Sequence, residues 1–393
     1  MSEIKVNSIK GVGASAAAIT VNNTDGTCTA NFTNRTNKNL IINGACLIAQ
    51  RGVSSTSTAY QTVDRFRMIT SGVDEAPTQA QADVASGTTP YTSGFRKCLK
   101  ITNGNQTSGA GAADFIKIQY RLEAQDIANS GWNYLSASSY ITLSFWVKSS
   151  VAQNFYGYLE TSDGSAYLYP FETGSLSADT WTKITKTIPG NSNLTFNNDN
   201  GQGLQIEIHP FMGTDSTASG VALNTWAAYA AGTRTPDQTS TWFTTNDSTL
   251  EITGLQLEVG SVATDFEHRS FHDELMKCMR YYHRTGEGSS VGSNVVLAQG
   301  WSRNSTLAQL SVFFPVPMRI APTAIETTGT AGDYRVSHGS TSGLCSAVPT
   351  FDGAGNRQAN IYFTVSSGMT TGIGARGVTE GSGTKFIAFS AEL

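Results

Sequence analysis

Residues 255–284 read LQLEVGSVATDFEHRSFHDELMKCMRYYHR and combine the end of a strand, a tight connection and the start of a helix. The leucines at its start alternate with polar residues, which places them on one face of a β-sheet. Just upstream, Leu250 and Ile252 alternate in the opposite phase. A slip of one residue would turn the strand inside out, so we predict that Gly254 forms a β-bulge that absorbs the slip.

The second half of this stretch predicts a helix over 271–283. Ser270 and Asp273 have the spacing of a capping pair, in which the serine side chain accepts a hydrogen bond from the helix backbone. About three turns of helix are marginal without a packing partner, so we expect this connecting segment, residues 270–284, to bridge two β domains or to lie at a subunit interface. The residues expected on the buried stripe of the helix are Phe271, Leu275, Cys278 and Tyr282.

Alternating strands also fill the chain upstream of this stretch. The clearest are 116–122, 140–148 and 204–209, each with apolar residues at alternate positions. Only 14% of the residues are charged and 39 are glycine, which favours short strands and turns over amphipathic helices. Residues 40–269 are therefore predicted to form a β-sandwich.

The length of 393 residues exceeds one ordinary core, and the remaining segments differ in composition. Residues 285–393 are rich in Gly, Ser and Thr, with strand patterns at 307–314, 360–365 and 385–389, so we predict a smaller C-terminal β-sandwich domain. Residues 1–39 hold too little apolar material for a core of their own. We expect them to order by docking on another protein.

The charge and the hydropathy argue against two classes of partner. The formal net charge is −4 and the lysines and arginines are not clustered, so we expect no nucleic-acid binding. No apolar run approaches about 18 residues, and the start of the chain does not resemble a signal peptide. We therefore expect a soluble protein with no membrane insertion.

The cysteines indicate a reducing compartment. They are widely spaced and never form a C-x-x-C pair, which predicts reduced, mostly buried thiols rather than a disulfide framework or a zinc site. The five cysteines are Cys28, Cys46, Cys98, Cys278 and Cys345.

Two motifs resemble those of a jelly-roll module found in bacteriophage tail fibre and related virion proteins. The opening motif of that module reads LINGxxxxxQRG, and residues 39–52 here read NLIINGACLIAQRG. The closing motif reads LQLExGxxATxFEHRxxxxELxxCxRYY and is matched within 255–284. The residues that match the opening motif are Ile42, Asn43, Gly44, Gln50, Arg51 and Gly52. The residues that match the closing motif are Leu255, Gln256, Leu257, Glu258, Gly260, Ala263, Thr264, Phe266, Glu267, His268, Arg269, Glu274, Leu275, Cys278, Arg280, Tyr281 and Tyr282.

The resemblance implies a carbohydrate-binding-module-like jelly roll over residues 40–269, in which the motif residues serve the structure. It also implies a non-enzymatic virion structural protein without a cofactor. The leading function is a tail fibre that attaches to the host surface, and the alternative is a capsid-bound head fibre or decoration protein. The expected partners are further copies of the chain in a homotrimer, other virion proteins held by the N-terminal segment, and a host-cell surface glycan. Assembly would take place in the bacterial host cytoplasm.

Aromatic residues around Asp163 and Gly164 form the candidate contact site. That dipeptide is typical of a two-residue hairpin turn, and counting outward places Tyr158 opposite Tyr169. The side chains then expected on one face are those of Tyr156, Tyr158, Glu160, Tyr167, Tyr169 and Phe171. Three roles stay open for this face: packing against the rest of the fold, contact with another virion subunit, and stacking on a glycan. Trp146, predicted to point outward from its own strand, is a further candidate contact residue.

Polar clusters offer other chemistries. His268 and His272 have carboxylates nearby, but they straddle the predicted helix start and do not share a helix face, so we predict no metal site. The asparagine-rich turn 197–201 has oxygen ligands for calcium but not the spacing of a calcium loop, which favours a plain turn. No nucleophile or phosphate-binding motif occurs, so no catalytic residue is predicted. A virion-associated glycan depolymerase remains the alternative from another class, because its two carboxylates need only be close in space.

Overall fold

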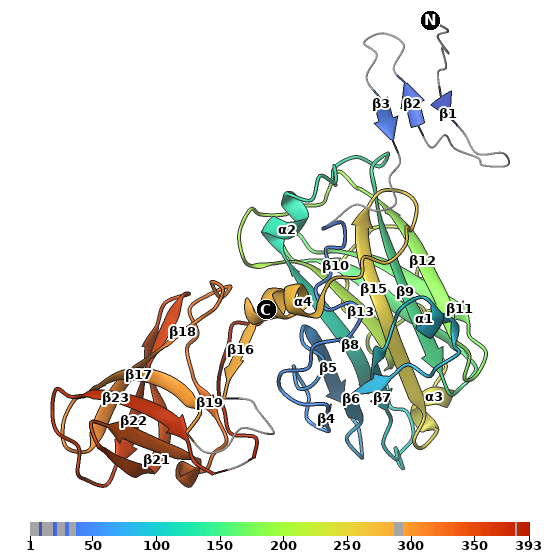
Figure 1. Ribbon diagram of the computed structural model, residues 1–393. Helices are drawn as coiled ribbons and strands as arrows, with labels where there is room; N and C mark the ends of the chain where they lie inside the picture. The colour runs from blue at the N-terminus through green and yellow to red at the C-terminus, as the bar shows by residue number, and fades with distance from the viewer. Residues whose placement is uncertain (1–7, 10–18, 22–27, 31–36, 287–293, 382) are drawn as a thin grey trace, which may run out of the picture.

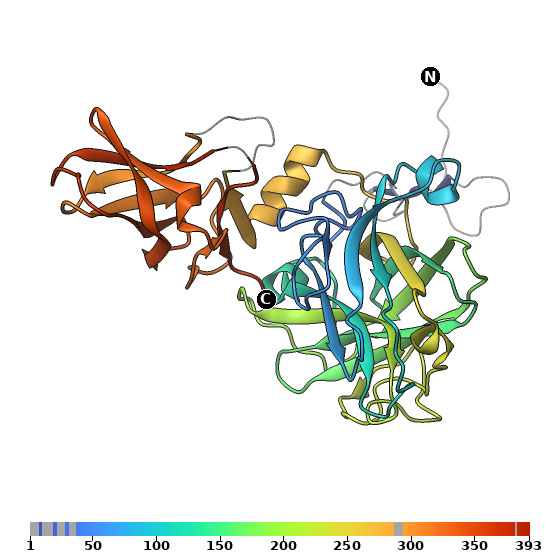
Figure 2. The ribbon, with the colours of Figure 1, turned by 90° about the horizontal axis from the view of Figure 1, so that it is seen from below.

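The computed structural model describes residues 8–9, 19–21, 28–30, 37–286, 294–381 and 383–393. The chain is mainly β, as predicted, and forms a large sandwich and a smaller barrel with a helix between them (Figure 1). Figure 2 shows the same two bodies side by side, with the C-terminus returning to the contact between them. No helix within these ranges is long and apolar enough to cross a membrane.

Two six-stranded antiparallel sheets form the sandwich. The first sheet has the strand order β14 (Ala227–Ala228), β11 (Tyr167–Ser175), β10 (Asn154–Thr161), β13 (Gln202–Met212), β8 (Phe115–Glu123) and β5 (Phe66–Ser71). The second has the order β12 (Thr182–Pro189), β9 (Tyr140–Ser149), β15 (Thr249–Val259), β7 (Lys97–Thr102), β6 (Thr78–Asp83) and β4 (Ser54–Ser55). The short helices beside them are α1 (Thr89–Thr92), α2 (Ala124–Ala128) and α3 (Thr241–Thr244). Many neighbouring strands are distant in sequence, as in a jelly roll.

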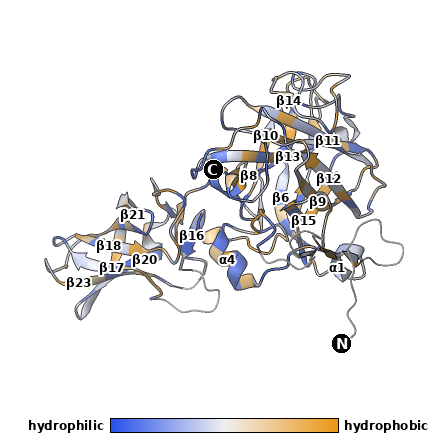
Figure 3. Cartoon of the chain, turned by 90° about the horizontal axis from the view of Figure 1, so that it is seen from above, coloured by the Kyte–Doolittle hydropathy of each residue, from blue (hydrophilic) through white to orange (hydrophobic). Residues whose placement is uncertain are grey.

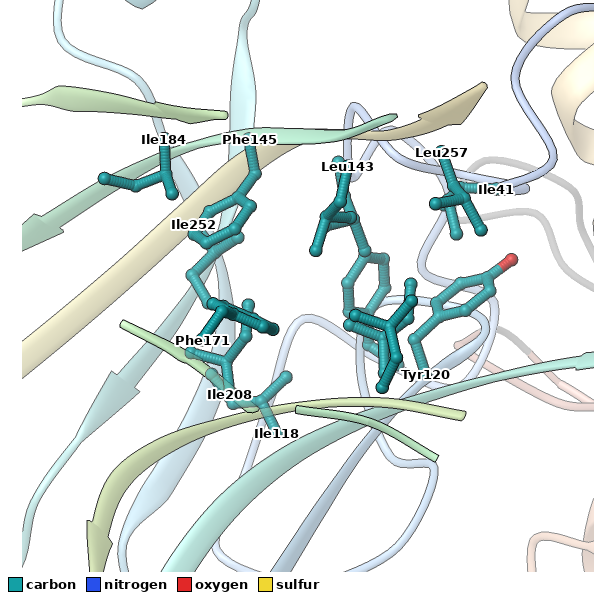
Figure 4. Close-up of a cluster of buried hydrophobic side chains, with 14 of the residues drawn as sticks. Ile41, Ile118, Tyr120, Leu143, Phe145, Phe171, Ile184, Ile208, Ile252 and Leu257 are labelled. Atoms are coloured by element: carbon teal, nitrogen blue, oxygen red, sulfur yellow. The ribbon is translucent and has the colours of Figure 1, made fainter. Parts of the chain in front are cut away.

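The core fills the space between the two sheets (Figure 4). Alternate residues of the second sheet, such as Leu143 and Ile252, point toward Ile118 and Phe171 of the first. Burying a side chain of this size contributes roughly 1.5–3 kcal/mol relative to leaving it exposed. The period-two pattern of the sequence is therefore the main source of stability in the sandwich.

The β-bulge predicted at Gly254 is confirmed. The pairing of β15 with β9 shifts register between Thr253 and Gln256, and Gly254 has a φ of +65°. A Cβ atom there would lie 2.7 Å from the Phe95 ring, so both the backbone and the available space require glycine. The apolar residues that reach the core from either side of the bulge are Leu250, Ile252, Leu255 and Leu257.

Helix α4 (Phe271–Met279) begins as predicted but ends early. The Ser270 hydroxyl accepts a hydrogen bond from the Asp273 amide at 3.1 Å. The predicted helix is too long because Tyr282–Thr285 form strand β16, which pairs with β24 (Ile387–Ser390) near the end of the chain. The helix is therefore shorter than predicted because the following residues pair with a strand that is remote in sequence.

The buried face of α4 differs from the predicted stripe. Phe271 is 61% exposed, whereas Glu274 and Cys278 are buried. The Glu274 carboxylate accepts hydrogen bonds from the Asn43 amide and the Arg269 guanidinium, which turns this face toward the sandwich. Hydrophilic and hydrophobic residues alternate along α4 in Figure 3, and the contacts of the buried Glu274 carboxylate help to orient the helix.

The C-terminal domain is β, as predicted, but its sheet closes into a barrel where the sequence led us to expect a sandwich. The barrel strands, in order, are β17 (Val296–Ser302), β18 (Leu307–Phe313), β22 (Gln358–Val365), β21 (Thr341–Ala354), β20 (Tyr334–His338) and β23 (Gly374–Thr379). Pairing of β23 with β17 closes it. Glycine permits the tight interior, since a Cβ on Gly377 would lie 2.7 Å from the Phe363 ring. Beside the barrel lie β19 (Glu326–Thr327), which pairs with β24 on the side opposite β16, and the 3-10 helix η1 (Ala331–Asp333).

The N-terminal segment is described only in part. Short strands β1 (Ser8–Ile9), β2 (Ile19–Val21) and β3 (Cys28–Ala30) form a small antiparallel sheet. Most of the predicted attachment segment 1–39 lies outside the described residues, so its role stays a prediction.

A buried cluster of charged and aromatic side chains joins the sandwich to the C-terminal domain. The Glu392 carboxylate forms ion pairs with Arg51 and Arg65. The Arg65 guanidinium carbon lies 3.4 Å from the centre of the Tyr281 ring, and that of Arg51 lies 3.6 Å from the centre of the Tyr282 ring. We call these five residues the junction cluster. Both sequence motifs and the chain end therefore meet at one place.

Two more arginines extend the contact between the domains. The Arg280 guanidinium and the Tyr281 hydroxyl both bond the buried Glu123 carboxylate, at 2.7 and 2.6 Å. Arg319 donates to the Asn200 carbonyl at 2.9 Å. The asparagine-rich turn considered for calcium therefore contributes a backbone oxygen to a domain contact.

Replacing Gly254 with alanine should lower the free energy of unfolding by about 2 kcal/mol or more. A residue other than glycine in the left-handed region costs about 1–2 kcal/mol, and the new Cβ also meets Phe95. Chemical denaturation measures the change. Gly353→Ala is the matched control, because a Cβ at Gly353 meets nothing within 4 Å. Equal losses in the two variants would mean that the bulge does not require glycine.

Candidate functional site

The predicted register of the tyrosine hairpin is wrong by one residue. In the structure Tyr158 pairs with Pro170, and Tyr169 pairs with Leu159. The connection is longer than a two-residue turn, because the Thr161 hydroxyl accepts a hydrogen bond from the Tyr167 amide at 2.9 Å and closes the last rung. A shift of one residue moves Tyr158 and Tyr169 to opposite faces of the sheet.

The four tyrosines therefore do not form one exposed platform. Tyr169 is buried in the sandwich core, where its ring centre lies 5.3 Å from that of Trp226, and Tyr167 packs half-buried against the same core. Tyr156 and Tyr158 face the other way, onto the outer surface of the first sheet. Tyr158 is 1% exposed, which leaves Tyr156 as the more accessible of the two.

Glu207 on β13 gathers the polar side chains of this outer face. Its Oε1 accepts hydrogen bonds from the Gln119 and Gln205 amides at 2.6 and 2.7 Å. Its Oε2 accepts one from the Tyr158 hydroxyl and lies 3.1 Å from His209 Nε2. Burial alone would raise the pKa of Glu207, but interactions with His209, Lys117 and Tyr158 outweigh burial and lower it to about 2. Glu207 is therefore an ionised hub that holds this face together.

A second carboxylate lies beside this hub. The Gln205 amide nitrogen donates to Glu207 at 2.7 Å and contacts Glu160 at 3.4 Å. Burial and the Glu207 charge raise the pKa of Glu160. This is the kind of carboxylate pair that the depolymerase alternative needs, yet a nucleophilic carboxylate must present an oxygen to the sugar. Both oxygens of Glu207 are already bonded and the residue is 1% exposed, which favours a structural role.

Trp146, the remaining predicted contact residue, lines a pocket of about 250 Å³ on the outer face of the second sheet. Ser144 and Trp146 point outward from β9, since their neighbours Leu143 and Phe145 point into the core. Lys183 lines the same pocket and is the cross-strand partner of Trp146. A volume below the roughly 300–1,000 Å³ of most small-molecule pockets suits one ring rather than an extended ligand.

The opposite wall of the pocket is aromatic and comes from two loops. The ring centres of Phe95 and Phe266 lie 4.9 Å apart, and the His268 ring lies within 5.0 Å of both. The His268 Nε2 contacts the Ser93 carbonyl at 2.9 Å. Gly94 has a φ of +98°, and a Cβ there would lie 2.9 Å from His268 Nε2. The glycine is therefore needed for this wall to form.

Charged side chains of opposite sign lie at the mouth of the pocket. Lys183 and Asp265 both line it and both are exposed. Ser144 and Thr264 add hydroxyl groups to the lining. The arrangement offers apolar ring faces together with donors and acceptors at the edge, which suits a ligand with one apolar face and several hydroxyl groups.

Residues of the closing motif, for which we predicted a structural role, hold the segment that carries this wall. Glu258 accepts hydrogen bonds from the Thr264 amide and hydroxyl at 2.8 and 2.6 Å. Gln256 accepts one from the Glu267 amide at 2.9 Å. Gly260, with a φ of +136°, lets the chain turn back over the sheet. The position of Phe266 and His268 thus follows from the closing motif.

The residues of the opening motif form a second group of contacts, next to the closing motif. The Asn43 side-chain amide donates to the Ile48 carbonyl at 2.8 Å, and Gln50 donates to the Tyr282 carbonyl at 2.9 Å. A Cβ on Gly44 would lie 2.0 Å from the Leu255 carbonyl oxygen, so the two motifs touch there. Gly52 has a φ of +153°.

The residues considered as metal ligands do not converge. Among the described residues, no group of three or more His, Cys, Asp or Glu side chains could hold a metal ion. Burial raises the pKa of the Cys46 thiol to about 12. The cysteines found as buried free thiols, as predicted, are Cys46, Cys98, Cys278 and Cys345.

Comparison with known proteins yields similarities of structure alone. No protein-family model and no curated protein matches the sequence. The chain is similar to the N-terminal cellulose-binding domain of a β-1,4-glucanase from Cellulomonas fimi, with 9% identity and a TM-score of 0.27 over 55% of this chain and 100% of that domain. It is also similar to a xylan-binding domain from Paenibacillus barcinonensis, with 10% identity and a TM-score of 0.25 over 55% and 96% of the two chains. A family 11 carbohydrate-binding module from Clostridium thermocellum gives 11% identity and a TM-score of 0.24 over 55% and 98%. At such TM-scores the ligand of this chain has to be argued from its own residues.

Replacing Glu207 with glutamine should flatten the acid dependence of stability. Because the pKa of Glu207 is lowered to about 2 from 4.5, its ionised form stabilises the fold fully above pH 4.5, and this contribution is lost as the pH falls toward 2. The free energy of unfolding of the parent should therefore fall more steeply than that of Glu207→Gln below about pH 4.5. Denaturant titrations at a series of pH values measure both slopes. Parallel curves would contradict the assignment.

Proposed function

We propose that this chain is a non-enzymatic virion structural protein, a tail fibre that attaches to the host surface by binding a glycan. The pocket beside Trp146 receives one sugar ring. The observation that carries the proposal is the lining of this pocket, in which aromatic rings lie next to the exposed charges of Lys183 and Asp265. Sugar rings have an apolar face of C–H groups and an edge of hydroxyl groups, and this lining complements both.

The virion setting is supported by the two sequence motifs, which resemble those of tail fibre proteins. In this setting residues 1–39 bind other virion proteins, and the chain forms a homotrimer. A single small pocket gives weak affinity, which repeated display on a symmetric fibre raises without any new contact. A capsid-bound head fibre or decoration protein with the same pocket is the alternative within this class.

Binding to purified surface polysaccharide of the host, or to a glycan array, tests the pocket. Lys183→Ala and Trp146→Ala should each weaken binding by roughly tenfold, because each removes a contact worth on the order of 1 kcal/mol. Lys183 is exposed, so its removal leaves folding unchanged, whereas Trp146→Ala also requires a check of thermal stability.

Lys100→Ala is the matched control. Lys100 lies on β7 of the same sheet and does not line the pocket. Equal binding by the parent, Lys183→Ala and Trp146→Ala would overturn the assignment of the pocket. Steady release of reducing sugar from the polysaccharide, abolished by Glu160→Gln, would instead establish the depolymerase alternative.

A further inference from the structure

The outer face of the first sheet carries an unusual group of cations, on the opposite side of the sandwich from the pocket. Arg67 lies on β5, Lys117 and Arg121 on β8, and Arg234 on the loop that follows β14. Strand pairing places Arg67 opposite Gln119, whose neighbours on β8 are Lys117 and Arg121. All four side chains are half-buried. We call these four residues the cationic face.

The three arginines of the cationic face have neutral partners. Arg67 donates to the Gln119 side-chain oxygen at 3.2 Å, and Arg121 Nε donates to the Gln205 side-chain oxygen at 3.1 Å. Arg234 donates to the Tyr229 hydroxyl at 2.9 Å. Among the described residues, no carboxylate oxygen lies within 4.0 Å of any of these three guanidinium groups, which is the limit for an ion pair.

The charge of the cationic face is only partly compensated. Lys117 forms an ion pair with Glu207 at 3.5 Å, whereas the three arginines have no carboxylate at that distance. The Nε atoms of Arg67 and Arg234 are buried and have no hydrogen-bond partner. Burial, and then the neighbouring charge of Arg67, lower the pKa of Arg121 more than Tyr60, Glu207 and Glu160 raise it. Half-buried arginines normally find a carboxylate, as Arg280 does with Glu123 elsewhere in this chain. The carboxylates of this face lie on β10 and β13, and the central one, Glu207, is already fully bonded.

We propose that the cationic face binds an acidic polysaccharide whose sugar rings carry carboxylates. A guanidinium group has a planar fork of donors that matches a carboxylate, so such a ligand would supply the anionic partners that Arg67 and Arg121 lack. The half-buried rings of Phe115 and Tyr156 lie on the same face and offer surfaces for a sugar ring. Charge and ring surface together favour a ring-borne carboxylate over a free phosphate, which needs no ring surface.

This inference is independent of the pocket beside Trp146. The formal net charge of the chain is −4, so attraction of an anionic ligand must come from a local cluster rather than from the whole molecule. Binding at such a cluster weakens as salt rises, since salt screens exposed and half-exposed charges. Salt dependence therefore separates this face from the pocket.

Calorimetric titration of the full chain with an oligogalacturonate of defined length tests the proposal, with the methyl ester of the same oligomer as the neutral control. The acid should bind and the ester should bind at least about tenfold more weakly. The double variant Arg67→Gln with Arg121→Gln should lose at least about tenfold in affinity for the acid. Its melting temperature should equal or exceed that of the parent, because two like charges without carboxylate partners are removed.

Further variants make the result decisive. Arg67→Lys with Arg121→Lys keeps the charge but loses the planar fork, so it should bind the acid several-fold more weakly than the parent while still preferring the acid to the ester. This result decides the matter if the glutamine variant fails to fold. Arg376→Gln is the matched control, because Arg376 lies on the barrel and has a neutral partner, the Ser337 hydroxyl at 3.5 Å. Trp146→Ala should leave uronate binding intact even if the pocket proposal fails. Equal binding of acid and ester, unchanged binding by the glutamine variant, or tight binding of polyphosphate without binding of the uronate would each overturn the proposal.

Discussion

The Glu392 carboxylate lies between Arg51 and Arg65, in a site covered by the rings of Tyr281 and Tyr282. Removing these charges from water is costly, and the loss is offset only where each charge finds a fixed partner. Arg65 accepts a φ of +74°, which is unfavourable for a residue with a side chain, in order to reach this site. The junction cluster is thus specified by several mutually dependent contacts. Removing Glu392 leaves both arginines without their carboxylate partner, whereas removing one arginine leaves Glu392 paired with the other.

The arrangement of the two domains depends on these contacts. Arg51 belongs to the opening motif, the two tyrosines to the closing motif, and Glu392 to the end of the chain, so the sandwich and the barrel are held as one unit. The segment that leads into the junction cluster through α4 also carries Phe266 and His268, the wall of the pocket. The same contacts that join the domains therefore support the proposed glycan site, while the cationic face lies on the other sheet.

Local patterns predicted the strands, the bulge and the start of the helix, because each depends on neighbours in the sequence. The predictions that were wrong depended on distant groups. The hairpin register differs from the predicted one where the Thr161 hydroxyl accepts a hydrogen bond from the Tyr167 amide. The buried face of α4 differs where Glu274 binds Asn43 and Arg269. The cationic face was missed since its members are scattered along the chain. The alternation around Lys117 and Arg121 places both outward, but it is visible only in three dimensions that Lys117 pairs with Glu207 while Arg121 bonds the neutral Gln205 side chain.

Calorimetric unfolding of Glu392→Gln tests the central role of the junction cluster most directly. The parent should unfold in one cooperative transition. The variant leaves two arginines buried without a carboxylate, so it should lose about 3–5 kcal/mol of stability and show separate transitions for the sandwich and the barrel. Glu380→Gln removes the partly exposed ion pair with Arg335, which should cost far less stability because solvent screens it, and serves as the control. A Glu392→Gln profile that matches the profiles of the control and the parent would contradict this account.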